Sequence, residues 1–205
     1  MFNAVEINSS FYRPHRRATY ERWAASVPRD FTFAVKLPKA VTHDARLAAD
    51  AAAVDRFLEE TGGLGRKRGP ILIQLPPSLP CDAAVAEAFF ASLRARTDAA
   101  LVCEPRHRSW FTPAADALLV SHRVARVAAD PPPVAVAGAP GGWTGLRYTR
   151  LHGSPDMYRS AYDAAAIADR AAAATDVDVD TWTIFDNTMT GAAIVNALQM
   201  RDLVR

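Results

Sequence analysis

Carboxylates, cations and an imidazole recur at the ends of short apolar runs in this sequence. Glu104 and His152 are residue types that transfer protons near neutral pH. Arg106 lies two positions after Glu104, and Arg150 lies two positions before His152. Their guanidinium groups can hold a carboxylate or phosphate through two parallel hydrogen bonds, and Lys36 adds a third cation. The pattern predicts acid–base chemistry on an anionic ligand, with Glu104 and His152 as the catalytic candidates.

Other polar side chains at the ends of these runs are candidates for ligand binding. They are Asn8, Tyr12, Lys36, Gln74, Arg106, Asp130, Arg150 and Asn187. Glu6 and Asp186 are candidate metal ligands, because their oxygens together with an imidazole suit Mn, Mg or Zn. The same carboxylates can instead pair with the nearby cations. Three interpretations stay open: structural ion pairing, a metal-free small-molecule or phosphate site, and a divalent metal centre.

Seven strand-like runs carry these residues. They are 2–8, 31–37, 71–75, 99–106, 123–130, 146–152 and 181–187. Strands that alternate with helices predict a parallel sheet, and the carboxyl-terminal ends of its strands meet at one mouth. Alternation predicts which side chains face that mouth. In the first run Val5 and Ile7 should face the helices, which turns Glu6 and Asn8 inward.

Helical patterns fill most of the gaps between the runs. They are predicted at 19–27, 47–60, 82–96, 112–121, 160–174 and 192–203. Asp82 and Thr112 are expected N-caps, and Ser160 with Asp163 resembles a capping box. Prolines and glycines in 131–143 forbid a regular helix, so this segment is predicted to be a loop at the mouth.

Composition limits the class of protein. With 205 residues, half of them hydrophobic, the chain suits one α/β domain spanning residues 1–205. A net charge of +2 is too weak a bias to indicate a polyanionic partner, so only the local placement of charge can argue for one. The basic cluster Arg66–Arg68 is interpreted as solvated charge away from the mouth. Cys81 and Cys103 are expected to be buried thiols in a reducing compartment. The sequence has neither a charged-then-apolar leader nor a membrane-spanning run, so we expect a cytoplasmic protein without a membrane partner.

Three motifs resemble a known family. They are VEINSSFYRP, CEPRHRSWF, and RLHG followed by IFDNT. Together with FAVKLPKAVTH and ILIQLPPS, they resemble the DUF72 (YecE-like) family from Phe2 to about Leu203. The resemblance implies a TIM-barrel-like β/α barrel, related in architecture to the metal-dependent endonuclease IV and xylose isomerase barrels. It implies no activity, because the activity of that family is not established.

The family resemblance also implies that this barrel is incomplete. Family members usually begin with a further strand that carries glycine, tryptophan and tyrosine, and this chain opens at what would be their second strand. The first and last strands would then have unpaired edges. An open barrel, a homo-oligomer that covers the exposed edge, and a shortened or mis-started chain are the alternatives, and we favour the third.

Two functions are compatible with these features. The first is a hydrolase or lyase that acts on a phosphate-bearing or sugar-like ligand at the carboxyl-terminal mouth. The second is a non-catalytic protein that binds nucleic acid or a phosphorylated metabolite, because basic and aromatic side chains interleave in the loops at this mouth. These loops hold Phe11, Tyr12, Arg13, His15, Arg16, Arg17, Lys39, His43, Arg46, His107, Arg108, Trp110 and Phe111. The same aromatic residues can simply anchor the loops.

Overall fold

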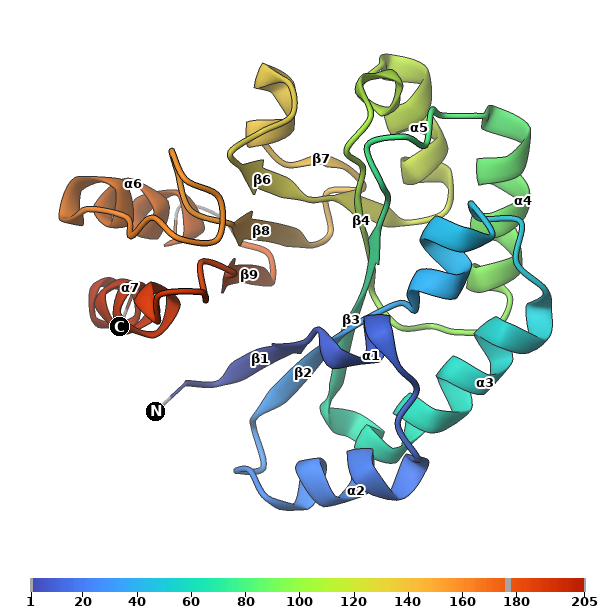
Figure 1. Cartoon of the computed structure of the whole chain (residues 1–205), viewed down its shortest axis with the longest axis horizontal. Coiled ribbons are helices and arrows are strands. Elements are labelled where there is room, and N and C mark those ends of the chain that lie inside the picture. Colours follow the sequence, from blue (N-terminus) through green and yellow to red (C-terminus); the bar gives the residue numbers. More distant parts are fainter. Residues whose placement is uncertain (1, 176–177, 205) are drawn as a thin grey trace.

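Parallel strands joined by helices make up most of the chain (Figure 1). The computed structural model describes residues 2–175 and 178–204. In the larger sheet the strands lie in chain order and run parallel: β1 (Ala4–Ile7), β2 (Thr32–Lys36), β3 (Arg68–Gln74), β4 (Leu101–Glu104) and β5 (Val124–Arg126). A two-residue strand, β7 (Gly141–Gly142), pairs antiparallel with β5. The smaller sheet is also parallel and contains β6 (Ala128–Asp130), β8 (Arg147–Leu151) and β9 (Thr181–Phe185).

Each predicted strand run contains a strand, which confirms the predicted α/β class with parallel strands. The run 123–130 differs in detail, because it forms the two strands β5 and β6. The N–H of Val127, between them, donates to the carbonyl of Cys103 at 2.8 Å. The N–H of His152 then donates to the carbonyl of Asp130 at 2.7 Å. The run therefore pairs first with β4 and then with β8, and it joins the two sheets.

Helices separate most of the strands. They are α1 (Ser9–Tyr12), α2 (Arg17–Ala25), α3 (Ala51–Thr61), α4 (Ala83–Arg94), α5 (Pro113–Ser121), α6 (Ala164–Thr175) and α7 (Ala192–Leu203). Short 3-10 or π turns occur at η1 (Ala40–Asp44), η2 (Gly62–Lys67), η3 (Arg108–Trp110) and η4 (Ala135–Gly138). None of the helices in the described part of the chain has the length and apolar character needed to cross a bilayer.

Asp82 and Thr112 cap their helices as predicted, whereas the predicted capping box of Ser160 and Asp163 does not form. The side chains of Asp82 and Thr112 accept N–H bonds from the first turns of α4 and α5. At α6 the Asp163 side chain accepts from the N–H of Ala166 at 2.8 Å. The Ser160 hydroxyl instead accepts from the N–H of Asp156. Ser160 is therefore part of the preceding loop and does not cap α6.

The basic cluster Arg66–Arg68 lies where η2 meets the start of β3, at the end of the strand opposite to the mouth. Its interpretation as solvated charge is wrong for two of the three residues. Lys67 Nζ donates to the carbonyls of Ala24 and Val27 at 2.6 and 2.8 Å, at the end of α2. Arg68 donates to the carbonyl of Leu58 in α3 at 3.4 Å. Both cations satisfy carbonyls near helix ends, where positive charge is favourable.

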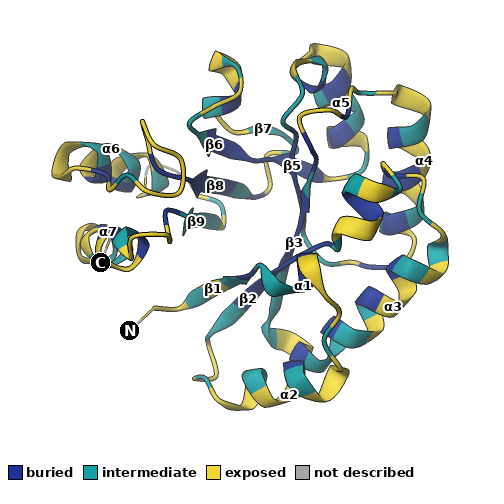
Figure 2. Ribbon diagram, in the orientation of Figure 1, coloured by how far each residue is buried: buried dark blue, intermediate teal, exposed yellow. Residues whose placement is uncertain are grey.

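Alternation along the strands separates an outer core from an inner face. Val35, Ile73 and Leu101 point outward and belong to the cluster that includes residues of α3 and α4. Leu72 and Val102 belong to a second cluster on the inner face. Figure 2 shows largely buried strands in the middle of the larger sheet, such as β3 and β5, and exposed outer faces on the surrounding helices. This packing fixes which strand residues point to the mouth.

The strand β1 forms one edge of the larger sheet, and β9 forms one edge of the smaller sheet. Across residues 2–175 and 178–204, no backbone ladder joins one to the other. A groove of about 1030 Å³ lies along both strands and α7, lined by residues such as Val5, Trp182 and Ile194. The predicted unpaired edges are therefore present in the described structure.

Candidate functional site

Arg150 is the centre of a buried charge network at the carboxyl-terminal ends of the strands. Its Nη2 donates to Glu6 Oε1 at 2.7 Å and to Asp186 Oδ2 at 3.0 Å. Its Nη1 donates to Glu104 Oε2 at 2.8 Å, and its Nε donates to Glu6 Oε2 at 3.1 Å. The side chain is 1% exposed, so these partners replace the water that the charge has lost. One cation thus joins carboxylates from β1, β4 and the residue after β9.

His152 lies between two of these carboxylates. Its Nε2 is 2.9 Å from Glu104 Oε1, and its Nδ1 is 3.1 Å from Asp186 Oδ2. Arg106 Nη2 approaches the same side, at 2.6 Å from Glu104 Oε1 and 2.9 Å from His152 Nε2. Each ring nitrogen therefore faces a carboxylate, and Nε2 can also accept from Arg106 when it carries no proton. The network accommodates either position of the imidazole proton.

Ion pairing keeps the network charged despite its burial. Burial alone would raise the pKa of Glu104, but Arg150, His152 and Arg106 outweigh it and hold that pKa below the usual carboxyl range. Burial also opposes ionisation of Asp186, yet the hydrogen bond from His152 and the charge of Arg150 lower its pKa. Burial would lower the pKa of Arg150, but Glu104, Glu6 and Asp186 raise it well above its ordinary value. Both carboxylates and the guanidinium are thus ionised at neutral pH.

Tyr148 is a member of the network that the sequence reasoning missed. Its hydroxyl donates to Glu6 Oε2 at 2.8 Å, and the residue is fully buried. Burial and the Glu6 charge raise the pKa of Tyr148 well above its ordinary value. The signal was available, because Tyr148 lies two residues before Arg150 and alternation puts both on one face of β8. We call Glu6, Glu104, Tyr148, Arg150 and His152 the floor of the site.

Lys36, at the end of β2, differs from the other cations of the site. Its Nζ lies 4.1 Å from the centroid of the Phe11 ring. Within the described residues, this amine makes neither a hydrogen bond nor an ion pair, although Lys36 is only 7% exposed. Burial and the charge of Arg150 lower the pKa of Lys36 to about 8, partly offset by Glu6, Glu104 and Asp186. The amine is therefore a cation that the protein leaves without a direct partner.

Four side chains lie above the floor and form what we call the mouth layer: Asn8, Lys36, Arg106 and Asp186. The side chains of Asp186 and Arg106 are 16% and 11% exposed, whereas Glu104 and His152 are buried. Asn8 Nδ2 is 3.4 Å from Asp186 Oδ1. Asn8 Oδ1 and Arg106 Nε are buried without a hydrogen-bond partner in the described residues. Unsatisfied polar atoms are rare in folded proteins, and here they mark where a ligand or water can bind.

The sequence matches the family described as "Protein of unknown function DUF72" over residues 1–205. The chain belongs to the DUF72 family. Two crystal structures of a DUF72 family protein from Enterococcus faecalis V583 resemble it, with TM-scores of 0.84 and 0.82 and 22% identity. Those matches cover 98% of this chain and 84% and 89% of the other chains. A DUF72 family protein from Thermotoga maritima MSB8 has a TM-score of 0.81 and 23% identity, over 99% of this chain and 85% of its own.

These similarities support the fold of the DUF72 chain and say nothing about its chemistry. A comparison with curated proteins gave no match. The family description states that the function is unknown, so the activity has to be argued from the geometry of the site.

The donor set of this DUF72 protein does not fit a divalent metal. Glu6 and Asp186, the predicted metal ligands, both pair with Arg150, whose guanidinium lies between them. Among the described residues, no group of three or more His, Cys, Asp and Glu side chains is placed to hold an ion. A metal here would have to displace Arg150 from a buried position. We therefore derive no step through a metal.

Two predicted ligand-binding residues lie outside the mouth layer. The Asp130 carboxylate points to Arg170 on α6, at 3.7 Å, because β6 belongs to the smaller sheet that α6 covers. Asn187 is fully buried, and its Nδ2 donates to the carbonyl of Ser160 and to Asn196 Oδ1. It ties the loop after β9 to α7 and to the loop before α6. The structure does not bring either side chain to the ligand space.

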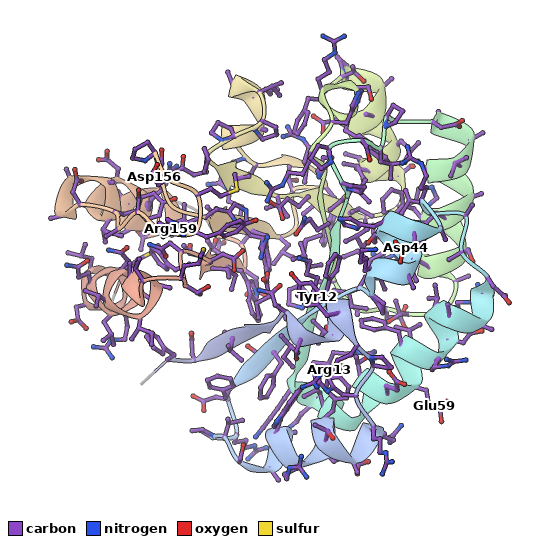
Figure 3. All side chains as sticks on the ribbon, viewed as in Figure 1. Tyr12, Arg13, Asp44, Glu59, Asp156 and Arg159 are labelled. Carbon is purple, nitrogen blue, oxygen red and sulfur yellow. The ribbon has the colours of Figure 1, made fainter. Side chains whose placement is uncertain are left out.

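Gln74 and Tyr12 are the two remaining predicted ligand-binding residues, and both lie near the mouth. Gln74 is the register partner of Glu104 in the neighbouring strand, so both side chains point to the same face of the sheet. Tyr12 is 78% exposed on α1, and Figure 3 shows it well apart from Asp156 and Arg159 on the loop after β8. The ring of Tyr158, on that loop, lies 5.8 Å from the His152 ring in an edge arrangement.

Most aromatic residues of the surrounding loops anchor those loops. Trp110 is buried, and its Nε1 donates to the carbonyl of Leu79 at 3.0 Å. Phe11 is buried beneath Lys36, and Phe111 lies 5.1 Å from the Arg126 guanidinium. The bases of a single-stranded nucleic acid would need exposed rings for stacking, and these three rings are largely engaged.

Proposed function

We propose that this protein is an enzyme that binds a small phosphate-bearing or sugar-like ligand at the mouth and acts on it by proton transfer, as a hydrolase or lyase. One observation carries the proposal: His152 is held between Glu104 and Asp186, beneath a mouth layer that contains an unpaired cation. A network built only to neutralise charge would have no reason to leave Lys36 without a partner.

Of the three side chains Glu104, His152 and Asp186, Asp186 is the one that a ligand can reach. Its Oδ2 is occupied by Arg150 and His152, whereas its Oδ1 has a single long contact to Asn8. A lowered pKa keeps Asp186 ionised, so Oδ1 can accept a proton from the ligand as a general base. His152 and Glu104 are buried and act as positioning residues, because they fix the orientation and charge of Asp186.

The cations of the mouth layer would hold the anionic group of the ligand. Arg106 has its Nη2 engaged with Glu104 and His152, while its Nε has no partner in the described structure. Lys36 offers three further donors. Most aromatic residues of the loops around the mouth are buried. A small phosphorylated or carboxylated ligand therefore fits these observations better than a nucleic acid does.

A panel of phosphorylated sugars and sugar acids, with binding measured by calorimetry and turnover by NMR, tests the proposal. For a panel member that reacts, Asp186→Asn is expected to lower kcat by about 10²–10⁴ while Kd stays within about threefold. His152→Ala should lower kcat and shift its pH profile, and Arg106→Met should weaken binding. Arg108→Met, on the neighbouring η3 turn, is the matched control and should change neither value.

Two outcomes contradict the proposed function. The first is a panel in which no compound binds. The second is turnover that survives Asp186→Asn, or binding that Arg106→Met and Arg108→Met weaken equally. Circular dichroism of each variant establishes that its fold is retained.

A further inference from the structure

We propose that Lys36 is a nucleophile that forms an imine with an aldehyde or ketone ligand carrying an anionic group. This inference rests on the proposed function and names its substrate class. It also favours the lyase form of that function, because an imine activates a carbonyl compound for cleavage or proton removal next to the carbonyl carbon.

The sequence uses lysine sparingly. Lys36, Lys39 and Lys67 are the only lysines among the 24 basic residues of the chain. Lys67 donates to the carbonyls of Ala24 and Val27, and Lys39 pairs with Asp44. Arginine serves at every other basic position, including Arg106 and Arg150 in the site. A guanidinium cannot form an imine. At the mouth, the unpaired amine of Lys36 therefore supplies a reactivity that an arginine would lack.

The surroundings of Lys36 favour a neutral amine. The amine is buried against the face of Phe11, which limits its solvation by water. The charged and titratable groups that act on it come from several elements: Glu6, Glu104, Asp186, Arg150 and His43. Burial and Arg150 together outweigh the carboxylates and lower its pKa to about 8. A useful fraction of neutral amine is thus present near physiological pH, as in other lysine nucleophiles.

The proposed step balances without a further reactant. The lone pair of neutral Nζ bonds to the carbonyl carbon, and the π electrons of the C=O bond move to oxygen. Both amine protons are transferred to that oxygen, the C–O bond breaks, and water leaves, so that amine and carbonyl give imine and water. After protonation by solvent, the imine nitrogen can accept electrons from the adjacent bond. The ionised Asp186 is the base available to remove a proton there.

Reductive trapping tests the proposal directly. The probes are pyruvate and dihydroxyacetone phosphate, each added with sodium borohydride at about pH 8, near the Lys36 pKa. Proteolysis and mass spectrometry then locate the reduced adduct. We expect Lys36 to be labelled by at least one ketone, more than about tenfold above Lys39, because Lys36 is buried at the mouth without a direct partner, whereas Lys39 is exposed and paired with Asp44.

Variants and matched ligands separate this proposal from the proposed function. Lys36→Arg and Lys36→Met should abolish the adduct, whereas Lys39→Arg and Lys67→Arg should leave it unchanged. Lactate and glycerol 3-phosphate, which lack the carbonyl group, are the binding controls. If these analogues bind and neither ketone labels Lys36 above Lys39, the imine is overturned and the proposed function stands. If neither the ketones nor their analogues bind, and no adduct forms, the imine is overturned. The proposed function is overturned as well only when no compound of the panel of phosphorylated sugars and sugar acids binds.

Discussion

The floor and the mouth layer differ in how their buried cations are paired. In the floor, Arg150 is surrounded by the carboxylates of Glu6, Glu104 and Asp186 at 2.7 to 3.1 Å. In the mouth layer, Lys36 is nearly as buried, and its amine lies against the ring of Phe11. The pKa of Arg150 is raised and that of Lys36 is lowered, so the same set of carboxylates stabilises one cation far more than the other.

This difference suits Arg150 to a structural role and Lys36 to the chemical role that we propose for it. Four of the five N–H donors of Arg150 bind carboxylates, so this guanidinium holds the ends of several strands together. An unpaired amine raises the free energy of the folded state, and that cost is removed when a ligand binds or reacts. The comparison leads to predictions that test each layer separately.

The largest expected effect concerns the floor. Arg150→Met leaves three buried carboxylates without their common partner, and we expect a loss of about 3–5 kcal/mol in the free energy of unfolding, measured in urea at neutral pH. Arg147→Met is the matched control on the same strand, because Arg147 makes one long contact, 3.5 Å to the carbonyl of Ala173. Equal losses in the two variants would mean that the network around Arg150 does not stabilise the fold.

The next effect is a loss of stability in acid. The folded-state pKa values of Glu104 and Asp186 lie below their ordinary values of 4.5 and 3.8. Their stabilisation is therefore present above those ordinary values and is lost as the pH falls through the folded-state values. Each carboxyl adds a slope of up to about 1.4 kcal/mol per pH unit.

Urea unfolding at several acidic pH values measures this slope. Glu104→Gln should flatten it, because the variant has one fewer carboxyl to protonate. Glu21→Gln, at an exposed pair with Arg17, should not. Parallel curves for wild type and Glu104→Gln would contradict the assignment.

A smaller effect of opposite sign is expected in the mouth layer. Lys36→Met removes a buried, unpaired cation and should raise the free energy of unfolding at neutral pH by about 1 kcal/mol. Between about 8 and the ordinary value of 10.5, the folded state releases the Lys36 proton while the unfolded state keeps it, so wild-type stability rises with pH. The advantage of the variant should therefore shrink at about pH 10. A loss of stability as large as that of Arg150→Met would remove the contrast between the layers.

The smallest effect is expected at Asp130, which the sequence suggested as a ligand contact. Its carboxylate lies 3.7 Å from the partly exposed Arg170, so Asp130→Asn should change stability by less than about 1 kcal/mol. Calorimetry should also find unchanged affinity for any ligand of the mouth. A marked loss of affinity would place Asp130 in the site after all.

Alternation was sufficient to bring the central residues together from sequence. The period of two along the β8 run predicted that Arg150 and His152 share one face, and parallel strands brought Glu6 and Glu104 to the same end. The same period puts Tyr148 on that face, although it was not selected from the sequence. This reasoning depends only on the backbone, which is why it held across most of the chain.

Details that depend on side-chain direction or on a change of sheet were not predictable in this way. Asp130 turns to Arg170 because the run 123–130 divides between two sheets. Asn187 turns into the loop packing, although its neighbour Asp186 reaches the site. The sequence also placed Lys36 beside the carboxylates, but only the structure shows that Arg150 takes all three of them.

The titration of Lys36 shows directly whether the two layers treat their buried cations differently. Three lysines give three side-chain signals in NMR spectra of the isotope-labelled protein, and Lys39→Arg and Lys67→Arg identify the signal of Lys36. We expect Lys36 to titrate with a pKa of about 8. Titration at the ordinary value of 10.5 would show a well-solvated or well-paired ammonium, and it would contradict the distinction between the floor and the mouth layer.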